Sequence, residues 1–136
     1  MAHYPRTRVA MGQLTQTQLQ VGSGAGTTVI TPRAGYNIRI LDGYLRAIGS
    51  GAGAATAVVV EDTGGTDVIS ATVGALGQNV VARCGDSNVT VTNLGATLGT
   101  GKGIRIGWAG GSAVTVTTGL DYMLKYVYEP VGNAAT

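Results

Sequence analysis

The chain has 136 residues, of which 44% are hydrophobic and 12% are charged, and its formal net charge is +2. This length suits one domain with a modest core, and so small a net charge excludes a broad nucleic-acid footprint. The single cysteine excludes an internal disulfide and fits a reducing place of synthesis. No apolar run is long enough for a membrane helix, and MAHYPRTRVA has no apolar segment of the kind that a secretion signal needs.

The low charged fraction is the most informative feature of the composition, because ordinary soluble domains have about 25% charged residues. Charged side chains on the surface normally keep protein molecules from associating with one another. A chain of this composition is therefore predicted to cover part of its surface with copies of itself or with a partner. The alternative is a monomer whose Thr, Ser, Asn and Gln side chains supply the polarity.

Residues 1–16 are not predicted to belong to the core, because they contain Pro5, the basic residues Arg6 and Arg8, and a polar run. They indicate either an extended arm, with strand pairing near residues 9–14, or a frayed terminus. Fully extended, about 15 residues span roughly 50 Å, enough to cross a neighbouring subunit.

Residues 17–129 are predicted to form one β domain. Glycine accounts for 23 residues, more than twice the average usage of about 7%, and its clusters alternate with runs of Val, Ile and Thr. Strands are predicted over 27–31, along a meander from 36 to 72, and over 80–84, 89–94, 104–108, 114–117 and 120–129. No long window has an apolar stripe at helical spacing, so almost no helix is expected.

The meander begins with a change of phase. Apolar residues occupy even positions up to Ile40 and odd positions from Leu41 onward, which requires either one extra residue in the strand or a tight turn. Asp42-Gly43 lies at the change and suits both. We favour a bulge inside one long bent strand, because a hairpin here would leave two very short arms.

The C-terminal strands have the clearest alternation. Residues 104–108 place Trp108 on the core-facing phase, and Ala109 to Ser112 are predicted to turn the chain. The last strand directs one set of side chains to the core: Leu120, Tyr122, Leu124, Tyr126 and Tyr128. Pro130 ends it, and residues 130–136 form a tail. About eight antiparallel strands of this kind predict a β-sandwich of the jelly-roll type.

The residue types that carry catalysis are scarce. The only histidine, His3, lies in the presumed arm, so catalytic triads and four-ligand zinc sites lack their residues, and we expect neither an enzyme nor a cofactor. Three acids, Glu61, Asp62 and Asp67, lie near one turn. We interpret them as a solvated hairpin loop, with a carboxylate pair or a calcium site as alternatives. Cys84 is expected to be a small apolar filler.

The Gly-rich strands resemble those of tailed-bacteriophage head decoration (cement) proteins. The resemblance lies in GYNIRILDGYLRAIGSGAGAATAVVVEDTGGTDVISA and GKGIRIGWAGGSAVTVTTGLDYMLKYVYE. It implies a jelly roll on the capsid exterior, made in the host bacterial cytoplasm, with the major capsid protein as its partner and a homotrimer as its assembly. Nucleic acid and membrane are not expected partners. No family residue can be carried over position by position.

The expected function is therefore structural: the chain binds the outer capsid surface and cements the head. The arm is the hypothetical docking segment, through Tyr4, Arg6 and Arg8. One alternative is another virion component, such as a head-fibre base, a spike or a tail protein. The other is a jelly-roll module for carbohydrate or another ligand, which would require an exposed Trp108.

Overall fold

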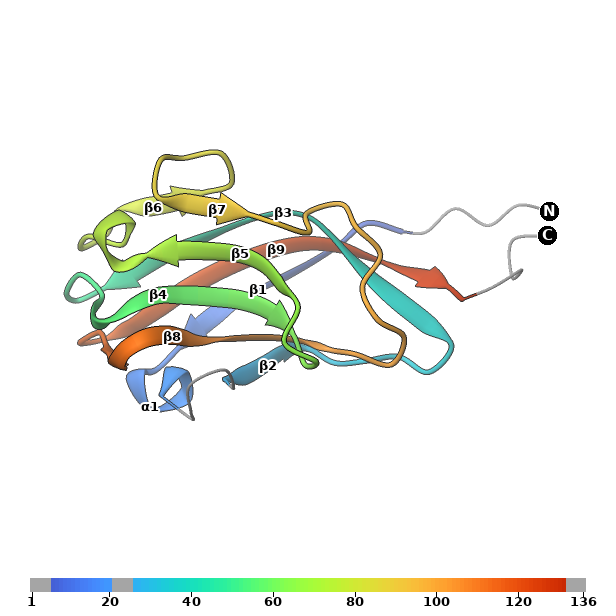
Figure 1. Cartoon of the computed structure of the whole chain (residues 1–136), viewed down its shortest axis with the longest axis horizontal. Helices are drawn as coiled ribbons and strands as arrows, with labels where there is room; N and C mark the ends of the chain where they lie inside the picture. The colour runs from blue at the N-terminus through green and yellow to red at the C-terminus, as the bar shows by residue number, and fades with distance from the viewer. Residues whose placement is uncertain (1–5, 21–25, 132–136) are drawn as a thin grey trace.

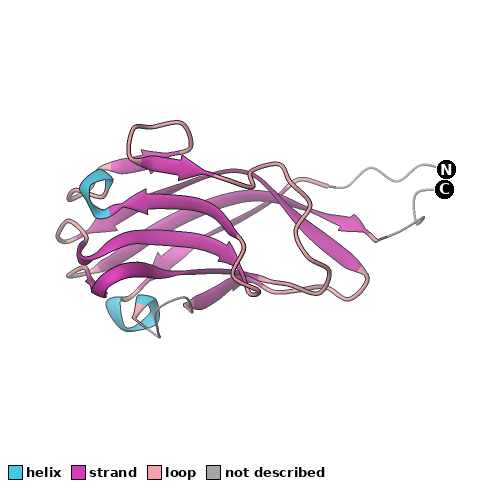
Figure 2. Cartoon of the chain, in the orientation of Figure 1, coloured by secondary structure: helices cyan, strands magenta, loops and turns pink. Residues whose placement is uncertain are grey.

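Two antiparallel sheets pack face to face in the computed structural model, which describes residues 6–20 and 26–131 (Figure 1, Figure 2). The four-stranded sheet has the order β1 (Arg8–Leu14), β9 (Gly119–Pro130), β3 (Tyr36–Ile48) and β6 (Val81–Arg83). The five-stranded sheet has the order β2 (Thr27–Ile30), β8 (Ile104–Thr115), β4 (Gly53–Asp62), β5 (Asp67–Thr72) and β7 (Val89–Val91). A short helix, α1 (Gln16–Leu19), and a 3-10 turn, η1 (Val73–Ala75), complete the described part. The predicted all-β sandwich is confirmed.

The strands pair in a nested order. β1 pairs with β9, β2 with β8, β3 with β6, and β4 with β5, all antiparallel. This is the order that arises when one long hairpin folds over into two sheets, as in a jelly roll. β7 adds to the edge of the five-stranded sheet by pairing with β5.

The core lies between the sheets and is aliphatic. Its largest fully buried side chains come from strands of both sheets, from α1 and from the segment after η1: Leu19, Ile38, Ile40, Leu45, Val58, Val60, Ile69, Leu76, Ile104, Ile106, Leu120 and Leu124. Burying one such side chain contributes about 1.5–3 kcal/mol. The alternation predicted for the last strand is confirmed, since Leu120 and Leu124 are buried and its three tyrosines pack against the core.

β3 is one continuous strand with a bulge, as predicted. Its register against β9 shifts between Ile40 and Asp42, which leaves Leu41 without a partner and 37% exposed. The Asp42 carboxylate accepts a hydrogen bond of 2.8 Å from the Gly43 amide. The extra residue lets Ile40 and Gly43, which are three positions apart, both lie on the buried face.

The predicted meander over 36–72 and the predicted turn at 109–112 were both wrong. The segment 36–72 is not a meander, because β3 and β4 belong to different sheets and only β4 and β5 form a hairpin. Gly49, at φ +87°, lets the chain leave the first sheet. The predicted turn at 109–112 lies inside β8. Gly110 and Gly111, at φ +70° and +67°, lie beside a register shift against β4, in which Ala55 pairs with Gly111 but Gly53 pairs with Thr115, and the strand does not reverse.

The N-terminal segment is part of the sandwich from Arg8 onward. The strand predicted near residues 9–14 is confirmed as β1, and Leu14 is only 4% exposed. α1 follows because Thr15 and Gln18 form a reciprocal capping box, and it buries Leu19. The predicted boundary after residue 16 therefore falls within α1. Within the described ranges, no helix has the length and apolar character needed to cross a membrane.

Candidate docking site

The four-stranded sheet extends past the other sheet at one end of the sandwich. Figure 1 shows that β3 and β9 continue beyond β4 and β5 toward the end at which β1 begins and β9 ends. On this extension the register places Tyr128 opposite Ile38, and Tyr36 opposite Pro130. Aromatic rings therefore pack beside the aliphatic core where the second sheet no longer covers the first.

The Tyr128 ring contacts two other tyrosine rings there in edge-to-face geometry. The ring centroids of Tyr126 and Tyr128 are 5.5 Å apart with the planes at 84°, and those of Tyr36 and Tyr128 are 6.2 Å apart at 76°. This geometry adds about 0.5–1.5 kcal/mol per pair beyond area burial. The Tyr128 hydroxyl donates a 2.7 Å hydrogen bond to the carbonyl oxygen of Thr31. The rings are therefore held in place before any partner binds.

Two exposed arginines lie on these rings. The guanidinium carbon of Arg33 is 4.2 Å from the Tyr36 ring centroid and 5.8 Å from that of Tyr128. The guanidinium carbon of Arg8 is 5.6 Å from the Tyr128 centroid. Such cation–π contacts contribute about 0.5–1 kcal/mol at exposed sites. We call these five residues the arginine–tyrosine cluster: Arg8, Arg33, Tyr36, Tyr126 and Tyr128.

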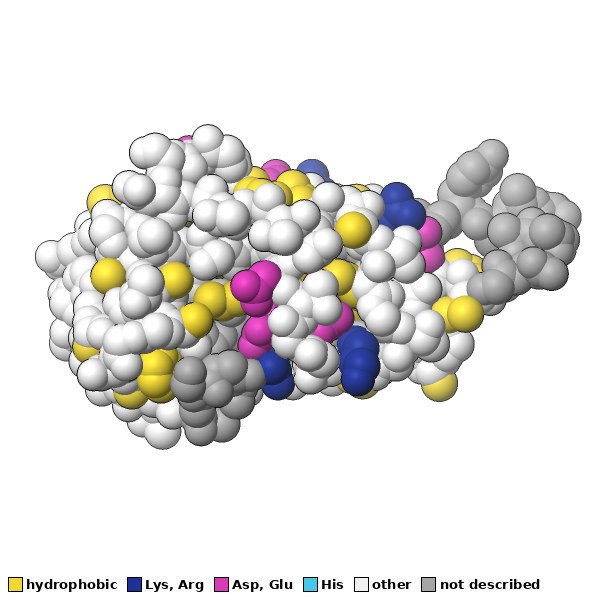
Figure 3. All heavy atoms as spheres, in the orientation of Figure 1, with side chains coloured by type: hydrophobic (Ala, Val, Ile, Leu, Met, Phe, Trp, Pro, Cys, Tyr) yellow, Lys and Arg dark blue, Asp and Glu magenta, His cyan; other side chains and the backbone are white. Residues whose placement is uncertain are grey.

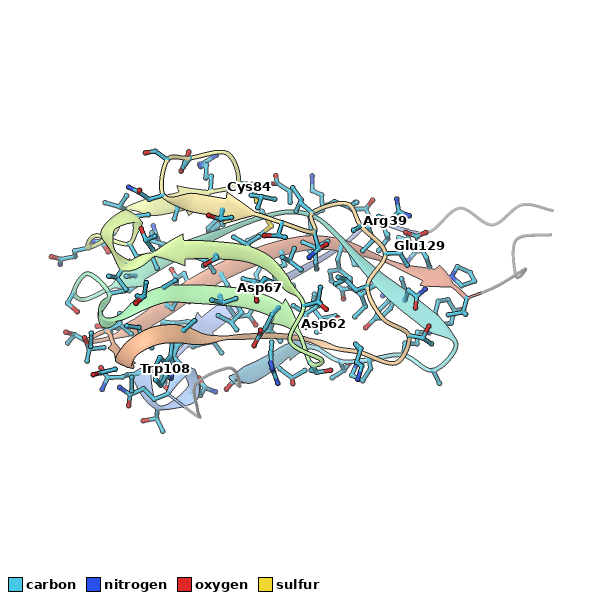
Figure 4. All side chains as sticks on the ribbon, viewed as in Figure 1. Arg39, Asp62, Asp67, Cys84, Trp108 and Glu129 are labelled. Atoms are coloured by element: carbon cyan, nitrogen blue, oxygen red, sulfur yellow. The ribbon has the colours of Figure 1, made fainter. Side chains whose placement is uncertain are left out.

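Within the described ranges, no ion pair neutralises the positive charge of the cluster. The described part of the chain contains three ion pairs: Arg39–Glu129, Arg46–Asp121 and Arg105–Glu61. Figure 4 shows Arg39 and Glu129 side by side near this end. Arg8, Arg33 and the exposed Arg6 take part in none of these pairs. The cluster thus presents positive charge that an acidic partner surface would complement.

The Tyr126 hydroxyl remains neutral at ordinary pH. Burial raises the pKa of Tyr126 above its usual value of 10.0, the neighbouring Tyr128 raises it further, and Arg8 opposes the shift. A neutral hydroxyl can donate and accept hydrogen bonds. The chemistry offered by the cluster is therefore cationic, aromatic and hydrogen-bonding.

Part of this cluster coincides with the predicted docking segment. Arg8 belongs to it and Arg6 lies two residues earlier, whereas Tyr4 falls outside the described residues. Arg33 and the tyrosines of the cluster were not predicted to share this surface, because alternation assigned the tyrosines of the last strand only to the core face. Their meeting with Arg33 depends on the register between β3 and β9, which no local pattern displays.

The three acids near the β4–β5 turn have a different role. Glu61 is 7% exposed, and its carboxylate accepts a 2.9 Å hydrogen bond from Nε of Arg105. Burial raises the pKa of Glu61, while Arg105 opposes that shift and Asp67 adds to it. Asp62 is 3% exposed and accepts hydrogen bonds of 2.8 and 2.9 Å from the amides of Gly64 and Thr66. The predicted solvated loop is therefore wrong for Glu61 and Asp62.

These acids lie on or beside the outer face of the five-stranded sheet. Figure 3 shows this face, where acidic and basic side chains gather beside one another and most of the remaining surface is uncharged. Figure 4 places Asp62 and Asp67 at neighbouring ends of β4 and β5. Among the described residues, no group of three or more His, Cys, Asp or Glu side chains could hold a metal ion. The buried acids close a turn and pair adjacent strands.

A hollow of about 330 Å³ lies on the outer side of the four-stranded sheet, beside the β3 bulge. It is lined by Asp42, Gly43, Tyr44, Arg83, Cys84 and Met123. The Cys84 thiol donates a 3.6 Å hydrogen bond to the carbonyl oxygen of Gly43. Burial raises the pKa of this thiol, and Asp42 raises it further. The thiol therefore stays protonated, which does not suit a nucleophile.

Trp108 packs against the core, as its predicted phase requires. It lies opposite Val58 in the β4–β8 register, and its Nε1 atom is buried without a hydrogen-bond partner. An aromatic platform for sugars needs an exposed ring face. Trp108 therefore does not supply the exposed ring that the ligand-binding alternative requires.

Comparisons with protein-family models, curated proteins and solved structures found no match to this chain.

Proposed function

We propose that this chain is a structural virion protein that binds the outer surface of a tailed-phage head as an oligomer and stabilises the capsid. The major capsid protein is the proposed partner, and the arginine–tyrosine cluster is the proposed docking surface. The observation that carries this proposal is the concentration, at one end of the sandwich, of ordered tyrosines and of exposed arginines that form no ion pair with another described residue. The resemblance of the Gly-rich strands to head decoration proteins supplies the capsid as the target.

The residue types in the cluster suit a protein interface. Tyrosine and arginine are enriched among the residues that carry most of the binding energy at interfaces. The rings already contact one another, and Tyr128 is bonded to Thr31, so binding needs to order few side chains. Each guanidinium group keeps N–H donors for partner carboxylates while its flat face rests on a ring.

An oligomer would strengthen this docking. A capsid repeats the same surface many times, and linked copies of a binding site engage such a surface together. Avidity of this kind can exceed the affinity of a single site by about 10²–10⁴. Each cluster therefore needs only modest affinity, which suits a surface of two main arginines and three rings.

Binding to heads that lack the protein tests the proposal. Labelled wild-type chain is mixed with such heads, and the bound fraction is measured by co-sedimentation. The double variant Arg8→Ala/Arg33→Ala should lose at least about tenfold in affinity, equivalent to about 1.4 kcal/mol. Arg83→Ala is the matched control, because Arg83 is also exposed but lies on β6.

Equal binding by the wild type and the double variant would contradict the role of the cluster. Equal losses in the double variant and the Arg83 control would indicate a general effect of charge and would contradict it too. Immunogold labelling of purified particles checks the location independently. Label on the tail instead of the head would favour the head-fibre, spike or tail alternative.

A further inference from the structure

We propose that the free edge of β1 pairs antiparallel with β1 of a second copy, so that two four-stranded sheets continue as one sheet across the pair. This surface is separate from the arginine–tyrosine cluster apart from Arg8, and the inference does not rest on the capsid proposal. It concerns how copies of the chain contact each other.

β1 is a long and regular edge strand. It lies at the end of the four-stranded sheet and pairs with β9 over seven residues without a register shift. No other described helix or strand packs extensively along it. In an antiparallel sheet, alternate residues of an edge strand direct their N–H and C=O groups away from the paired strand. β1 therefore offers a row of backbone donors and acceptors to another extended chain.

The other described edge strands are short, and α1 contacts β8, where Gln20 Nε2 donates a 2.6 Å hydrogen bond to the Val114 carbonyl oxygen. β6 and β7 have three residues each, and β2 has four with a register shift between Thr28 and Ile30. The part of β3 beyond β6 is covered by the loop before β8, whose Gly95 and Leu98 amides donate hydrogen bonds of 2.7 and 3.1 Å to β3 carbonyls. Short, bulged or covered edges are the usual defences against unwanted pairing. β1 has none of these, and its only charge is Arg8 at its start.

The side chains of β1 also favour association. Val9 and Met11 are 53% and 65% exposed, the highest values among the exposed large hydrophobic residues of the described chain. Both lie on the outer face of the sheet, opposite Lys125 and Met123 of β9. On the inner face, Ala10 is only half-buried. A strand added beside β1 would remove apolar surface from water on both faces of the sheet.

A second copy of β1 is the best-matched occupant of this edge. The remaining edge strands have only three or four residues, whereas another β1 offers seven. Antiparallel pairing about Met11 sets each Arg8 near Leu14 of the other copy, which keeps the two positive charges apart. A parallel pair would bring them together. The contact is two-fold and isologous, so it predicts a dimer or an assembly of dimers in place of the expected homotrimer.

The mass of the full-length chain in solution tests this pairing. Sedimentation equilibrium over a range of concentrations should give twice the mass of the chain for the wild type. Met11→Lys places like charges beside each other at the two-fold axis and should raise the dissociation constant at least about tenfold. Val80→Lys is the matched control, because Val80 is 51% exposed and precedes β6 at the opposite edge of the sheet. It should associate like the wild type.

Amide hydrogen exchange along β1 gives a second, direct readout. In the dimer, consecutive amides between Val9 and Gln13 should be protected. On dilution to the monomer, every second amide should exchange rapidly while its neighbours stay bonded to β9. A monomeric wild type, a Met11→Lys variant that associates normally, or a dimer whose alternate β1 amides stay unprotected would each overturn the proposal. Unchanged circular dichroism of Met11→Lys would show that this variant is folded.

Discussion

The hydroxyl of Tyr128 donates a 2.7 Å hydrogen bond to the carbonyl oxygen of Thr31, joining the last strand to the segment that follows β2. Tyr128→Phe removes this bond but keeps the ring, so it should lower the free energy of unfolding by about 0.5–1.5 kcal/mol. Urea unfolding followed by circular dichroism measures the change. Tyr36→Phe is the control, because the Tyr36 ring contacts Tyr128 without such a bond. Equal effects of the two variants on the free energy of unfolding would contradict a stabilising role for this hydrogen bond.

Gly43 is required by close packing at the bulge. A Cβ atom at this position would lie 2.8 Å from Leu124 Cδ2 and 3.0 Å from the Met123 carbonyl oxygen. Gly43→Ala should therefore destabilise the protein by about 1–3 kcal/mol through overpacking. Gly74→Ala is the matched control, since its nearest neighbour would be 3.7 Å away, and it should be close to neutral. Urea unfolding measures the change in the free energy of unfolding. An unchanged free energy in Gly43→Ala would mean that the backbone at the bulge can shift to accept a Cβ atom.

The buried Glu61 should make stability depend on pH. Burial raises the pKa of the Glu61 carboxyl in the folded protein above the usual value of 4.5, so the folded state binds the carboxyl proton more tightly than the unfolded state does. The contribution of this proton to the free energy of unfolding is complete below pH 4.5 and is lost as the pH rises through the pKa of the folded state. Relative to Glu61→Gln, which does not titrate, the wild type should thus gain stability as the pH falls through this window. A wild-type advantage that grows with rising pH would show that the ion pair with Arg105 dominates.

Trp108 offers a spectroscopic check on the sandwich, because it is the only tryptophan. Its ring packs against the core and its Nε1 atom is buried. Iodide should therefore quench the fluorescence of the folded protein much less than that of the urea-unfolded protein. Similar Stern–Volmer slopes for the two states would contradict the packing of Trp108 against the core. They would favour the alternative that the protein is a ligand-binding module.

Periodicity along the sequence was sufficient where one face of a strand is buried. The alternation of the last strand, the phase change at Leu41 and the core-facing Trp108 all follow from it. It failed at Gly110 and Gly111, because a pair of glycines suits a reversal of the chain as well as a bulge within a strand. The sequence of β1 permits both an arm and a frayed terminus, because an edge strand exposed on its outer face lacks a strong apolar pattern.

The candidate sites depend on register, and this limits what sequence reasoning can find. Glu61 and Arg105 are neighbours because β4 pairs with β8, although 44 positions separate them. Arg33 reaches Tyr128 because β3 pairs with β9 and Tyr36 follows Arg33 closely. The sequence could indicate positive charge near the N-terminus through Arg6 and Arg8. It could not indicate that Arg33 and three tyrosines complete the same surface.

A cryo-electron microscopy reconstruction of phage heads mixed with this chain would show directly whether and how it binds. We expect density for the sandwich on the outer capsid surface, with Arg8, Arg33 and Tyr128 facing acidic residues of the capsid protein. Heads without such density, or sandwiches bound through the opposite end with the arginine–tyrosine cluster in solvent, would contradict this expectation.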